Sequence, residues 1–454
     1  MADYLPHTSD EVASMLAFLG MDSLEQLFDH VPAAVRLNQG LDLADGMSEP
    51  DVGAHFARFS AANRATSAAM TCFAGAGAYD HEIPSVVRAL ASRSEFVTAY
   101  TPYQPEVAQG VLQAIFEYQT LVSRLSGLTI ANASLYDGAT ALVEALNMAA
   151  GATGRSTMYV SSGVHPHWRA VARTFAQGTG HRIVEVALRD GMTQWDSVEV
   201  SDAAAIVGAY PNYLGVLEDM GEYARLARDS DALFVFCGDP VAAGVLKTAG
   251  QWGADVFVGE GQPLGTALSF GGPYLGLFAC SVEQVRRLPG RIVGETVDSN
   301  GRRAFVTTLR AREQDIRREK ATSNVCTNQT LMAVTAAIQL GWLGTQGLRA
   351  IATRCAQGAH YLFDQVVQIP GVEAACDQPF FREFALRVRG GAREVLAAMA
   401  EHDVLGGLEV AALTGGEDPS VPEGIDDLVL VAVTERRTRD ELDNYVNVLR
   451  KVVR

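Results

Sequence analysis

Short apolar runs rich in β-branched and aromatic residues alternate with amphipathic stretches through the middle of the chain. Between residues 155 and 280 the runs are STMYVSS, RIVEVAL, AAIVGAY, ALFVFCG, DVFVGE and YLGLFAC. Helical stretches such as HPHWRAVARTFAQ and MGEYARLARDS separate several of them. Each run has the length and composition of a buried strand. Strands that alternate with helices predict a mostly parallel sheet flanked by helices, which is an α/β fold.

Both ends of the chain have a different pattern. SDEVASMLAFLG repeats apolar residues at helical spacing, with a cap at Ser9 or Asp10 and a stop at Gly20. Ser48 caps a second helix that has Pro50 in its first turn. Near the other end, helical stretches surround the runs EFALRV and LVLVAVT. We therefore expect a helical N-terminal arm over 1–68, a large α/β domain over 69–330 and a small α+β C-terminal domain over 331–454.

Composition and charge disfavour several classes of protein. The chain has 454 residues, of which 48% are hydrophobic and 20% charged, as in ordinary globular proteins. Its first residues show no signal-peptide pattern, and no apolar run reaches the ~18 residues of a membrane span. The six cysteines are scattered without a C-x-x-C pair, which disfavours a metal site or a disulfide framework and favours a cytoplasmic location. A net charge of −17 disfavours nucleic acid and anionic membranes as partners.

The segment 286–320 opposes this acidic balance. It carries ten Arg or Lys residues and five Asp or Glu residues, a local charge of +5. Such a segment is either a solvated basic face or a docking surface for an acidic partner or a substrate carboxylate. We expect RAREQDIRREK to form a charged helix before a polar turn. There Arg318, Lys320 and Asn324 have side chains that can bind a carboxylate or a phosphate.

The stretch DVFVGEGQPLGTALSFGGP (Asp255–Pro273) predicts a strand that runs into a glycine-rich loop. Its glycines follow the spacing G-x-G-x-x-x-G, one residue too long for a dinucleotide-binding fingerprint. One class of α/β enzymes carries a lysine on pyridoxal phosphate at such a place, yet this stretch has none. The chain has three lysines, and none is well placed for a Schiff base: Lys247 in the apparent helix VAAGVLKTAGQW, Lys320 after the charged helix, and Lys451 near the C-terminus.

Two aspartates lie where the charge of a ligand would be bound. Asp137 lies at the amino end of the helix expected in NASLYDGATALVEALNMAA, where it would cap the helix and repel a phosphate. Asp239 follows the strand ALFVFCG. A carboxylate there either caps a helix that starts near Val241 or faces a pocket as the partner of a pyridinium nitrogen. His165, at the start of another helix, is a further candidate for contact with a pocket.

The loop YTPYQPE (Tyr100–Glu106) carries two tyrosines, three residues apart, and two prolines. Pro102 and Pro105 restrict their own backbone and that of the preceding residues, so the loop is stiff. A stiff loop that presents aromatic hydroxyls and an amide favours a recognition surface or an active-site wall over a purely structural loop.

Several long motifs together carry a family resemblance. AYTPYQPEVAQGVLQAIFEYQTLVSRLSGL, ASLYDGATALVEA, GEGQPLGTALSFGGPYLG and GETVDSNGRRAFVTTLRAREQDIRREKATSNVCTNQ look like segments of glycine dehydrogenase (decarboxylating) subunit 1. That family is the α subunit of the two-chain P-protein of the glycine cleavage system. The resemblance covers nearly the whole chain. It implies the architecture of fold-type-I pyridoxal-phosphate enzymes and an α2β2 assembly with a homologous β subunit.

The resemblance also implies that the partner chain holds the cofactor. In the β subunit the Schiff-base lysine belongs to a motif D-V-x-H-x-N-x-H-K. Asp255 and Val256 match the start of this motif, and the lysine position falls near Pro263. Asp239 matches the position that pairs with the cofactor's ring nitrogen, but in the sequence GDP rather than D-G-A-N. We therefore expect no covalently bound cofactor on this chain and pyridoxal phosphate in the β subunit.

The activity that the resemblance implies is decarboxylation of glycine by the complex, with transfer of the aminomethyl group to the lipoyl arm of H-protein. Decarboxylation gains from a dry site, so residues that close the partner's pocket matter. Our hypothesis is that this chain supplies such a wall, with substrate contacts from Tyr100, Thr101, Tyr103, Gln104, Tyr136, Asp137 and Asn324. A second hypothesis makes the basic segment a contact for an anion or for H-protein through Arg302, Arg303, Arg318 and Lys320. Two alternatives are a scaffold that only stabilises the β subunit and a self-sufficient enzyme that uses Lys247.

Overall fold

The computed structural model describes residues 6–37, 40–64, 69–98, 101–269, 271–414 and 427–453. The chain divides into two compact units, Met1–Asn63 and Arg64–Arg454. Tyr100 lies outside the described residues. The expected boundary between a large and a small domain at residues 330 and 331 stays a prediction.

The Met1–Asn63 unit consists of four short helical elements: α1 (Ser9–Leu19), the 3₁₀ turns η1 (Leu24–Phe28) and η2 (Ala33–Val35), and α2 (Glu49–Ala62). The helix expected to be capped at Ser9 or Asp10 is instead capped by Thr8. Its hydroxyl accepts from the Glu11 amide while the Glu11 carboxylate accepts from the Thr8 amide. Ser48 caps the second helix as expected. None of these described helical elements has a buried side chain.

The Arg64–Arg454 unit contains a seven-stranded sheet in the order β2-β10-β9-β8-β7-β3-β4. Its strands are β2 (Ile130–Ala131), β3 (Thr157–Ser161), β4 (Arg182–Val186), β7 (Ala203–Tyr210), β8 (Leu233–Gly238), β9 (Val256–Glu260) and β10 (Gly276–Cys280). The pairs from β9 through β8, β7 and β3 to β4 are parallel, whereas β10 runs antiparallel to both of its neighbours. All six apolar runs form strands of this sheet, so the mostly parallel α/β arrangement is confirmed.

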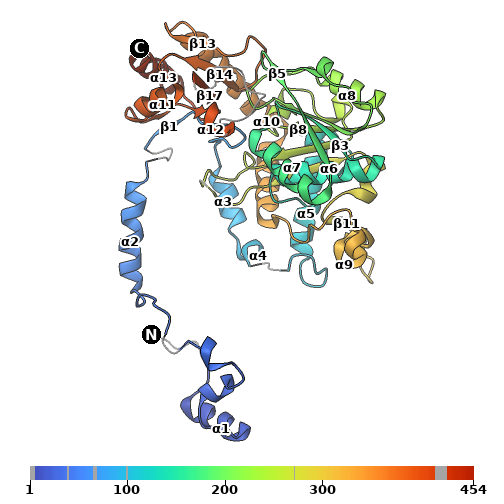
Figure 1. Ribbon diagram of the computed structural model, residues 1–454, viewed down its shortest axis with the longest axis vertical. Coiled ribbons are helices and arrows are strands. Elements are labelled where there is room, and N and C mark those ends of the chain that lie inside the picture. Colours follow the sequence, from blue (N-terminus) through green and yellow to red (C-terminus); the bar gives the residue numbers. More distant parts are fainter. Residues whose placement is uncertain are drawn as a thin grey trace. The chain divides into compact units, whose positions relative to one another are not determined.

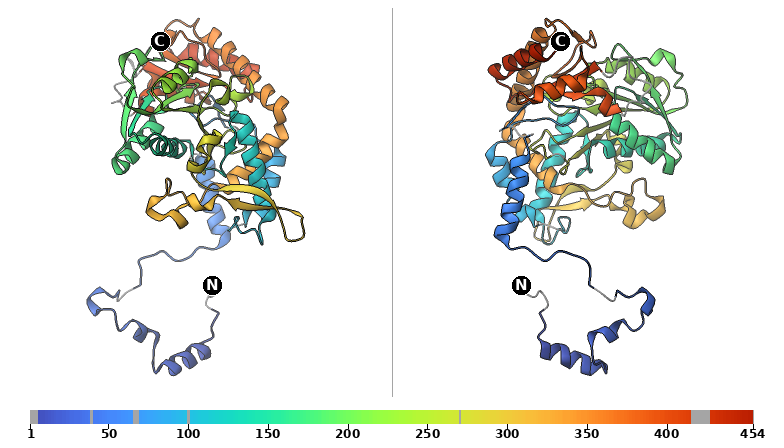
Figure 2. Two further views of the ribbon diagram at one scale, coloured as in Figure 1. Left: turned by 90° about the vertical axis from the view of Figure 1, so that its right-hand side faces the viewer. Right: turned by 60° about the vertical axis from the view of Figure 1, so that its left-hand side comes forward.

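Helices cover both faces of the large sheet (Figures 1 and 2). α5 (Gln109–Ser126) and α8 (Met220–Asp229) share one apolar core with Phe234 and Phe236 of β8. α6 (Gly138–Thr153) and α7 (Pro166–Thr179) share the opposite core with Val235 and Cys237. Successive residues of β8 therefore enter opposite cores, which explains why this strand is apolar throughout.

A second, antiparallel sheet lies near the C-terminus in the order β13-β14-β17-β16. Its strands are β13 (Val372–Ala374), β14 (Glu383–Val388), β16 (Leu408–Glu409) and β17 (Leu428–Ala432), and its helices are α11 (Ala392–Ala400), α12 (Val410–Thr414) and α13 (Arg439–Val452). The long helix α10 (Thr330–Val366) contacts α5 beside the first sheet and α13 beside the second. Its backbone breaks at Gly344, whose φ is +58°.

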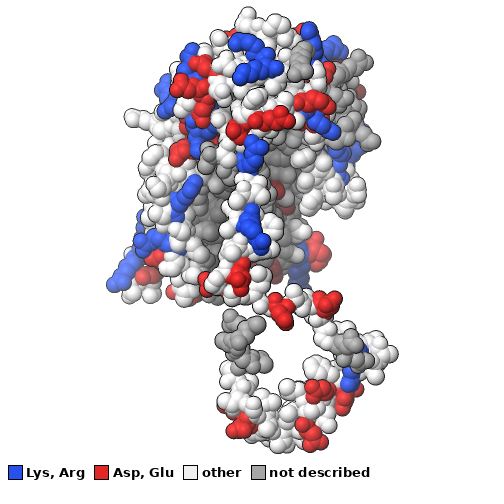
Figure 3. Space-filling view, turned by 90° about the vertical axis from the view of Figure 1, so that its left-hand side faces the viewer, with Lys and Arg blue, Asp and Glu red and all other residues white. Residues whose placement is uncertain are grey.

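The smaller elements complete this unit. They are α3 (Ser85–Ala91), α4 (Ser94–Val97), the strand pair β1 (Thr71–Cys72) and β15 (Val404–Leu405), the hairpin β5 (Leu188–Arg189) and β6 (Met192–Thr193), the hairpin β11 (Ile292–Val297) and β12 (Arg303–Thr308), and the turns η3 (Trp195–Ser197) and η6 (Val282–Arg287). On the face in Figure 3, Lys and Arg side chains of this unit lie among Asp and Glu side chains. None of the described helices combines the length and apolar character that crossing a lipid bilayer requires.

Two expected helices are wrong. The charged stretch RAREQDIRREK forms three short pieces: η7 (Arg310–Arg312), α9 (Gln314–Arg317) and η8 (Arg318–Lys320). It has no apolar stripe to hold one helix against the core. The stretch VAAGVLKTAGQW forms only the turns η4 (Ala242–Gly244) and η5 (Gly250–Trp252). Lys247 lies between these turns, with its ammonium 4.3 Å from the centre of the Trp252 ring.

Candidate functional site

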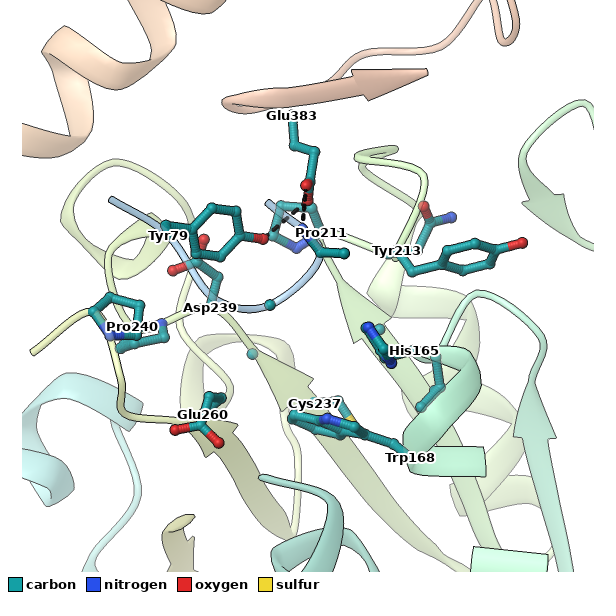
Figure 4. Close-up of a pocket in the computed structure, with 17 residues that line it drawn as sticks. Tyr79, His165, Trp168, Pro211, Tyr213, Cys237, Asp239, Pro240, Glu260 and Glu383 are labelled. Carbon is teal, nitrogen blue, oxygen red and sulfur yellow. Dashed lines mark hydrogen bonds between the residues drawn. The ribbon is translucent and has the colours of Figure 1, made fainter. Parts of the chain in front are cut away.

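A cavity of about 80 Å³ lies at the carboxyl ends of the central parallel strands (Figure 4). In parallel α/β sheets this edge is where ligands bind. Asp239 follows β8 and Glu260 ends β9. Glu383, the first residue of β14, closes the cavity from the second sheet, and Tyr79 comes from the segment before α3. Residues from both sheets of the larger unit thus line the cavity.

Asp239 forms a buried ion pair with Arg382. Its Oδ2 atom lies 2.6 Å from Nη2 of Arg382, whose side chain is 1% exposed. Its Oδ1 atom accepts from the amide of Val241 at 2.8 Å, before the short turn that stands where a capped helix was expected. The guanidinium lies 3.7 Å from the centre of the Tyr79 ring. Burial alone would lower the pKa of Arg382, but Asp239 together with Tyr79, Cys355 and Glu383 outweighs burial and raises it.

Arg382 also makes a buried contact with His81. Its Nη1 atom donates to Nε2 of His81, so the proton of this imidazole lies on Nδ1, which is 2.6 Å from Glu435. Burial opposes ionisation of Glu435, but the hydrogen bond from His81 lowers its pKa to about 2. The Cys355 thiol also donates to Glu435. His81, Cys355 and Glu435 resemble a metal site in composition, with ligand atoms within 4.8 Å of one another. A guanidinium against the second nitrogen of the imidazole disfavours a metal ion there, because metal-bound histidines donate from that nitrogen.

Two carboxylates accept hydrogen bonds from amides at the amino end of α6. Asp137 caps the helix as expected, with Oδ1 2.8 Å from the Thr140 amide. Glu260 accepts from the Gly138 amide at 3.0 Å through Oε2, and through Oε1 from two more amides, those of Gln262 and Leu275, at 2.9 and 3.0 Å. Burial raises the pKa of Glu260 to about 7, although the three amides favour its ionised form.

The Trp168 ring fills the space beside the amino end of α6. A Cβ atom added to Gly138 would lie 2.1 Å from Cζ2 of Trp168, so only glycine fits against this ring. His165 caps α7 by accepting from the His167 amide at 3.1 Å, and burial lowers its pKa to about 4. It is therefore a neutral lining group of the cavity at pH 7.

Glu383 closes the opposite side of the cavity. Its two carboxylate oxygens accept from the Ala76 amide at 2.6 Å and from the Tyr79 hydroxyl at 2.9 Å. Figure 4 shows both contacts above the ends of the large sheet. Burial raises the pKa of Glu383 to about 7.

The loops that contain the expected pocket-wall residues are joined by a polar chain. The Tyr103 hydroxyl lies 3.1 Å from Oγ1 of Thr330, which donates to Oδ1 of Asn328 at 3.1 Å. The Asn328 amide donates in turn to Oγ of Ser134 at 2.7 Å. Ser134 has a φ of +136°, a strained value for a residue with a side chain, two positions before Tyr136. The loops at 101–104 and 132–137 are therefore held together, and whether they form a wall of the partner's pocket stays a prediction.

The remaining wall residues are placed differently. Thr101, Gln104 and Tyr136 are exposed, and Tyr136 does not line the cavity at Asp239. Asn324 is exposed in a separate depression, which it shares with Glu144 and Arg318. The structure thus brings Tyr103 close to the loop of Tyr136 and separates Asn324 from Asp239.

The basic segment is partly neutralised within itself. Arg303 pairs across its hairpin with Glu295 at 2.7 Å, and Arg310 pairs with Asp315 at 2.5 Å. Arg302, Arg318 and Lys320 are exposed. Within the described residues, no carboxylate lies within 4 Å of their charged groups. They share this state with Arg286 and Arg317, which are also exposed and form no ion pair among the described residues.

Reasoning from the sequence missed six side chains of the site: Tyr79, His81, Trp168, Glu260, Arg382 and Glu383. Glu260 had one available signal, because it is the only charged residue in the buried run VFVGE. Arg382 had a similar signal, as a charge flanked by two phenylalanines and an apolar strand. Neither signal identifies its partner, because the amides and carboxylate that these side chains meet lie far away in the sequence.

The comparisons with known proteins agree on one family. The family model of the glycine cleavage system P-protein matches residues 2–449. The probable glycine dehydrogenase (decarboxylating) subunit 1 of Desulforamulus reducens is 44% identical over 443 residues, 97% of either chain. The protein of the same name from Prosthecochloris aestuarii is 46% identical over 447 residues, 98% of either chain.

Solved structures extend this likeness to the fold. A crystal structure of glycine decarboxylase (P-protein) of the glycine cleavage system, in inhibitor-bound form, matches with a TM-score of 0.90 at 44% identity over the full length of both chains. A cysteine desulfurase from Thermococcus onnurineus matches with a TM-score of 0.63 at 14% identity, over 90% of this chain and 99% of that one, which is a likeness of fold alone. The expected fold-type-I architecture of pyridoxal-phosphate enzymes is confirmed.

Proposed function

The chain belongs to the glycine cleavage system P-protein family, and we propose that it is the half of a two-chain glycine decarboxylase that does not hold pyridoxal phosphate. Its activity is that of decarboxylating glycine dehydrogenase, exercised as one subunit of a complex. The partner in this proposal is a homologous β subunit in an α2β2 assembly. The substrates of the complex are glycine and the lipoyl arm of H-protein.

One observation carries the proposal: Pro263 lines the cavity where the resemblance puts the Schiff-base lysine. A Schiff base needs an amine that faces the pocket. Of the three lysines, Lys247 lies on Trp252, and neither Lys320 nor Lys451 lines the cavity. The self-sufficient enzyme that uses Lys247 is accordingly disfavoured.

The other groups of the cavity also fit the cofactor poorly. A phosphate needs free amides at the amino end of a helix, but Asp137 and Glu260 already accept from those of α6. A pyridinium nitrogen needs a free carboxylate, but Asp239 is paired with Arg382. We therefore derive no catalytic step on this chain's own cavity.

The contribution proposed for this chain is a wall of the partner's pocket. Hydrogen bonds through Thr330 and Asn328 join the stiff loop with Tyr103 to Ser134. Ser134 lies on the loop that carries the exposed ring of Tyr136. A fixed wall of this kind excludes water and holds the substrate carboxylate in a reactive orientation. Arg302, Arg318 and Lys320 supply a basic surface for acidic H-protein. We place the complex in the cytoplasm, in keeping with cysteines that are all unpaired among the described residues.

The experiment is an absorbance spectrum of the pure full-length chain with pyridoxal phosphate, before and after borohydride reduction. We expect no lysine-bound cofactor band on this chain alone, and glycine decarboxylation once the β subunit is added. Mass spectrometry after reduction locates any cofactor that becomes fixed. A reducible band on this chain, mapped to one of its three lysines, would overturn the proposal.

A further inference from the structure

Buried carboxylates line both ends of the cavity, and the chain itself supplies a partner to each. At one end Glu260 accepts from the Gly138 amide of α6, and at the other Asp239 pairs with Arg382, which is not itself a lining residue. We propose that these two side chains are internal substitutes for the charged ends of a lost cofactor, Glu260 for its phosphate and Arg382 for its protonated ring nitrogen. The inference deepens the proposed function, on which it rests, because it explains what closes the cofactor-free site.

The Glu260 end has the contacts of an anion site. The amino end of a helix binds anions through its free amides and its dipole. Here Oε2 of Glu260 accepts a hydrogen bond from the Gly138 amide, and Oε1 accepts from the amides of Gln262 and Leu275 in the segment after β9. Three amide donors on one buried carboxylate reproduce the hydrogen bonding of a bound oxyanion. Glu260 is 8% exposed, so water does not supply these contacts in its place.

The Arg382 end has the contacts of a planar cation. Asp239 stands at the carboxyl end of β8, the position at which a carboxylate pairs with a pyridinium nitrogen. Its Oδ2 atom faces Nη2 of Arg382 at 2.6 Å instead. The guanidinium is planar and positively charged, as a protonated pyridine ring is, and it lies 3.7 Å from the centre of the Tyr79 ring.

Trp168 restricts the space between the two ends. The cavity measures about 80 Å³. Trp168 fills the volume beside Gly138, next to the amide that Glu260 takes. Glu260 and Trp168 therefore occupy the phosphate end of the cavity, and Arg382 occupies the carboxylate that a ring nitrogen would need.

A closed arrangement follows that needs no ligand. Glu383 begins β14 of the second sheet, and Arg382 directly precedes it. Arg382 pairs with Asp239 at the end of β8, and Glu383 accepts from Ala76 and Tyr79, which lie before α3. In this chain the two sheets are thus joined by built-in charges. Such a half presents a rigid wall to its partner whether or not substrate is bound, which is the property that the proposed function requires.

The test of the Glu260 end is a gain of phosphate binding at pH 8, where the carboxylate is ionised. Glu260→Ala frees the Gly138 amide, and calorimetric titration of the full-length chain measures binding of inorganic phosphate. We expect binding about tenfold tighter or more than that of the wild-type chain, since a charge-assisted contact becomes available. Glu383→Gln is the matched control, because it removes an equally buried negative charge from the same cavity away from α6, and it should gain nothing.

The test of the Arg382 end uses a small aromatic cation. Arg382→Ala leaves Asp239 unpaired beside a new space, and the probe is 2-aminopyridinium, whose ring N–H is a donor. We expect this variant to bind the probe and to recover thermal stability in its presence. The wild-type chain and Arg303→Ala, which opens no buried space, should do neither. Glu260→Ser and Arg382→Ser serve the same tests if the alanine variants do not fold.

The outcomes separate this inference from the proposed function. No gain of phosphate binding in the Glu260 variants, or phosphate binding by the wild-type chain as tight as theirs, contradicts substitution at that end. No binding of the cation by the Arg382 variants contradicts it at the other end. Neither probe needs a lysine. A failure here therefore leaves the spectrum test of the proposed function untouched, and a lysine-bound cofactor would overturn that proposal separately.

Discussion

The guanidinium of Arg382 lies 2.6 Å from the carboxylate of Asp239, and this ion pair joins the two sheets of the larger unit. The same guanidinium contacts His81, which reaches Glu435 on the segment after β17. Buried ion pairs of this kind contribute little net stability when complete, but removal of one partner leaves an uncompensated charge in the interior. The contact therefore fixes how the sheets sit around the cavity.

Arg382→Met is expected to lower the free energy of unfolding of the full-length chain by about 3–5 kcal/mol. The reason is that Asp239, 12% exposed, loses its counter-charge in a buried position. Chemical denaturation followed by circular dichroism measures the change. Asp239→Asn should have a similar effect, because it leaves Arg382 without its carboxylate.

Arg303→Met is the matched control for this prediction. Arg303 also pairs with a carboxylate, that of Glu295 at 2.7 Å, but the two side chains are 58% and 47% exposed. Solvent screens such a pair, so the loss should stay within about 1 kcal/mol. Equal losses from Arg382→Met and Arg303→Met would show that the buried pair has no special role.

The pH dependence of stability should reveal Glu383. Burial raises its folded-state pKa to about 7 from 4.5, so the folded chain binds more protons than the unfolded chain between these values. Stability from this group is complete below pH 4.5 and is lost as the pH rises through about 7. Relative to Glu383→Gln, the wild-type chain should lose up to about 3 kcal/mol over this range, at roughly 1.4 kcal/mol per pH unit. Denaturation curves of both proteins at several pH values measure the difference.

Glu435 provides a control of the opposite sign. Its pKa is lowered to about 2, so its contribution is present above pH 4.5 and is lost only as the pH falls towards 2. The stabilising contribution of Glu435 should therefore shrink as the pH falls below 4.5, opposite in direction to that of Glu383. If the difference between the wild-type chain and Glu383→Gln stayed constant between pH 5 and 8, Glu383 would be ionised throughout this window.

The sequence predicts the strands well because each is an apolar run bounded by turn residues. The failures have local causes: the charged stretch at 310–320 has no apolar face, and Thr8 takes the cap that Ser9 or Asp10 was expected to form. The site was accessible only in part. Asp137, Asp239 and Pro263 stand at positions that local pattern or resemblance marks. Arg382 was not accessible, because its role depends on Asp239, a contact between two sheets that spacing along the chain does not encode.

Tyr136 should matter for catalysis by the complex although it lies outside this chain's own cavity. Its ring is 40% exposed on a loop held by Ser134 and Asn328, so it is available to a partner's pocket. Tyr136→Ala is expected to slow release of CO2 from glycine by roughly tenfold or more, because a misplaced wall costs orientation and admits water. Tyr136→Phe keeps the ring and should retain most of the activity if packing is what matters. Tyr103→Phe, which loses the contact with Thr330, tests the support of the loop.

Assembly must be measured beside turnover in these variants. Analytical ultracentrifugation with the β subunit shows whether the complex still forms. Reduced turnover in an intact complex supports the wall. Unchanged turnover for Tyr136→Ala and Tyr103→Phe in an intact complex would instead favour the scaffold alternative, in which this chain never touches substrate.

Arg318 and Lys320 should govern recognition of H-protein. Both are exposed, and neither has a carboxylate within ion-pair distance among the described residues, whereas Arg303 is already paired with Glu295. The double variant Arg318→Glu with Lys320→Glu should raise the KM for H-protein several-fold at low salt. The difference should shrink as ionic strength rises, because salt screens contacts between exposed charges over about 10 Å. The kcat at saturating H-protein should be unchanged, since these side chains are proposed to meet the carrier protein and not glycine.

Arg225→Glu, at an exposed position of α8, is a control that adds negative charge elsewhere and should leave the KM as it is. An unchanged KM in the double variant would remove H-protein from this surface and leave a solvated basic face.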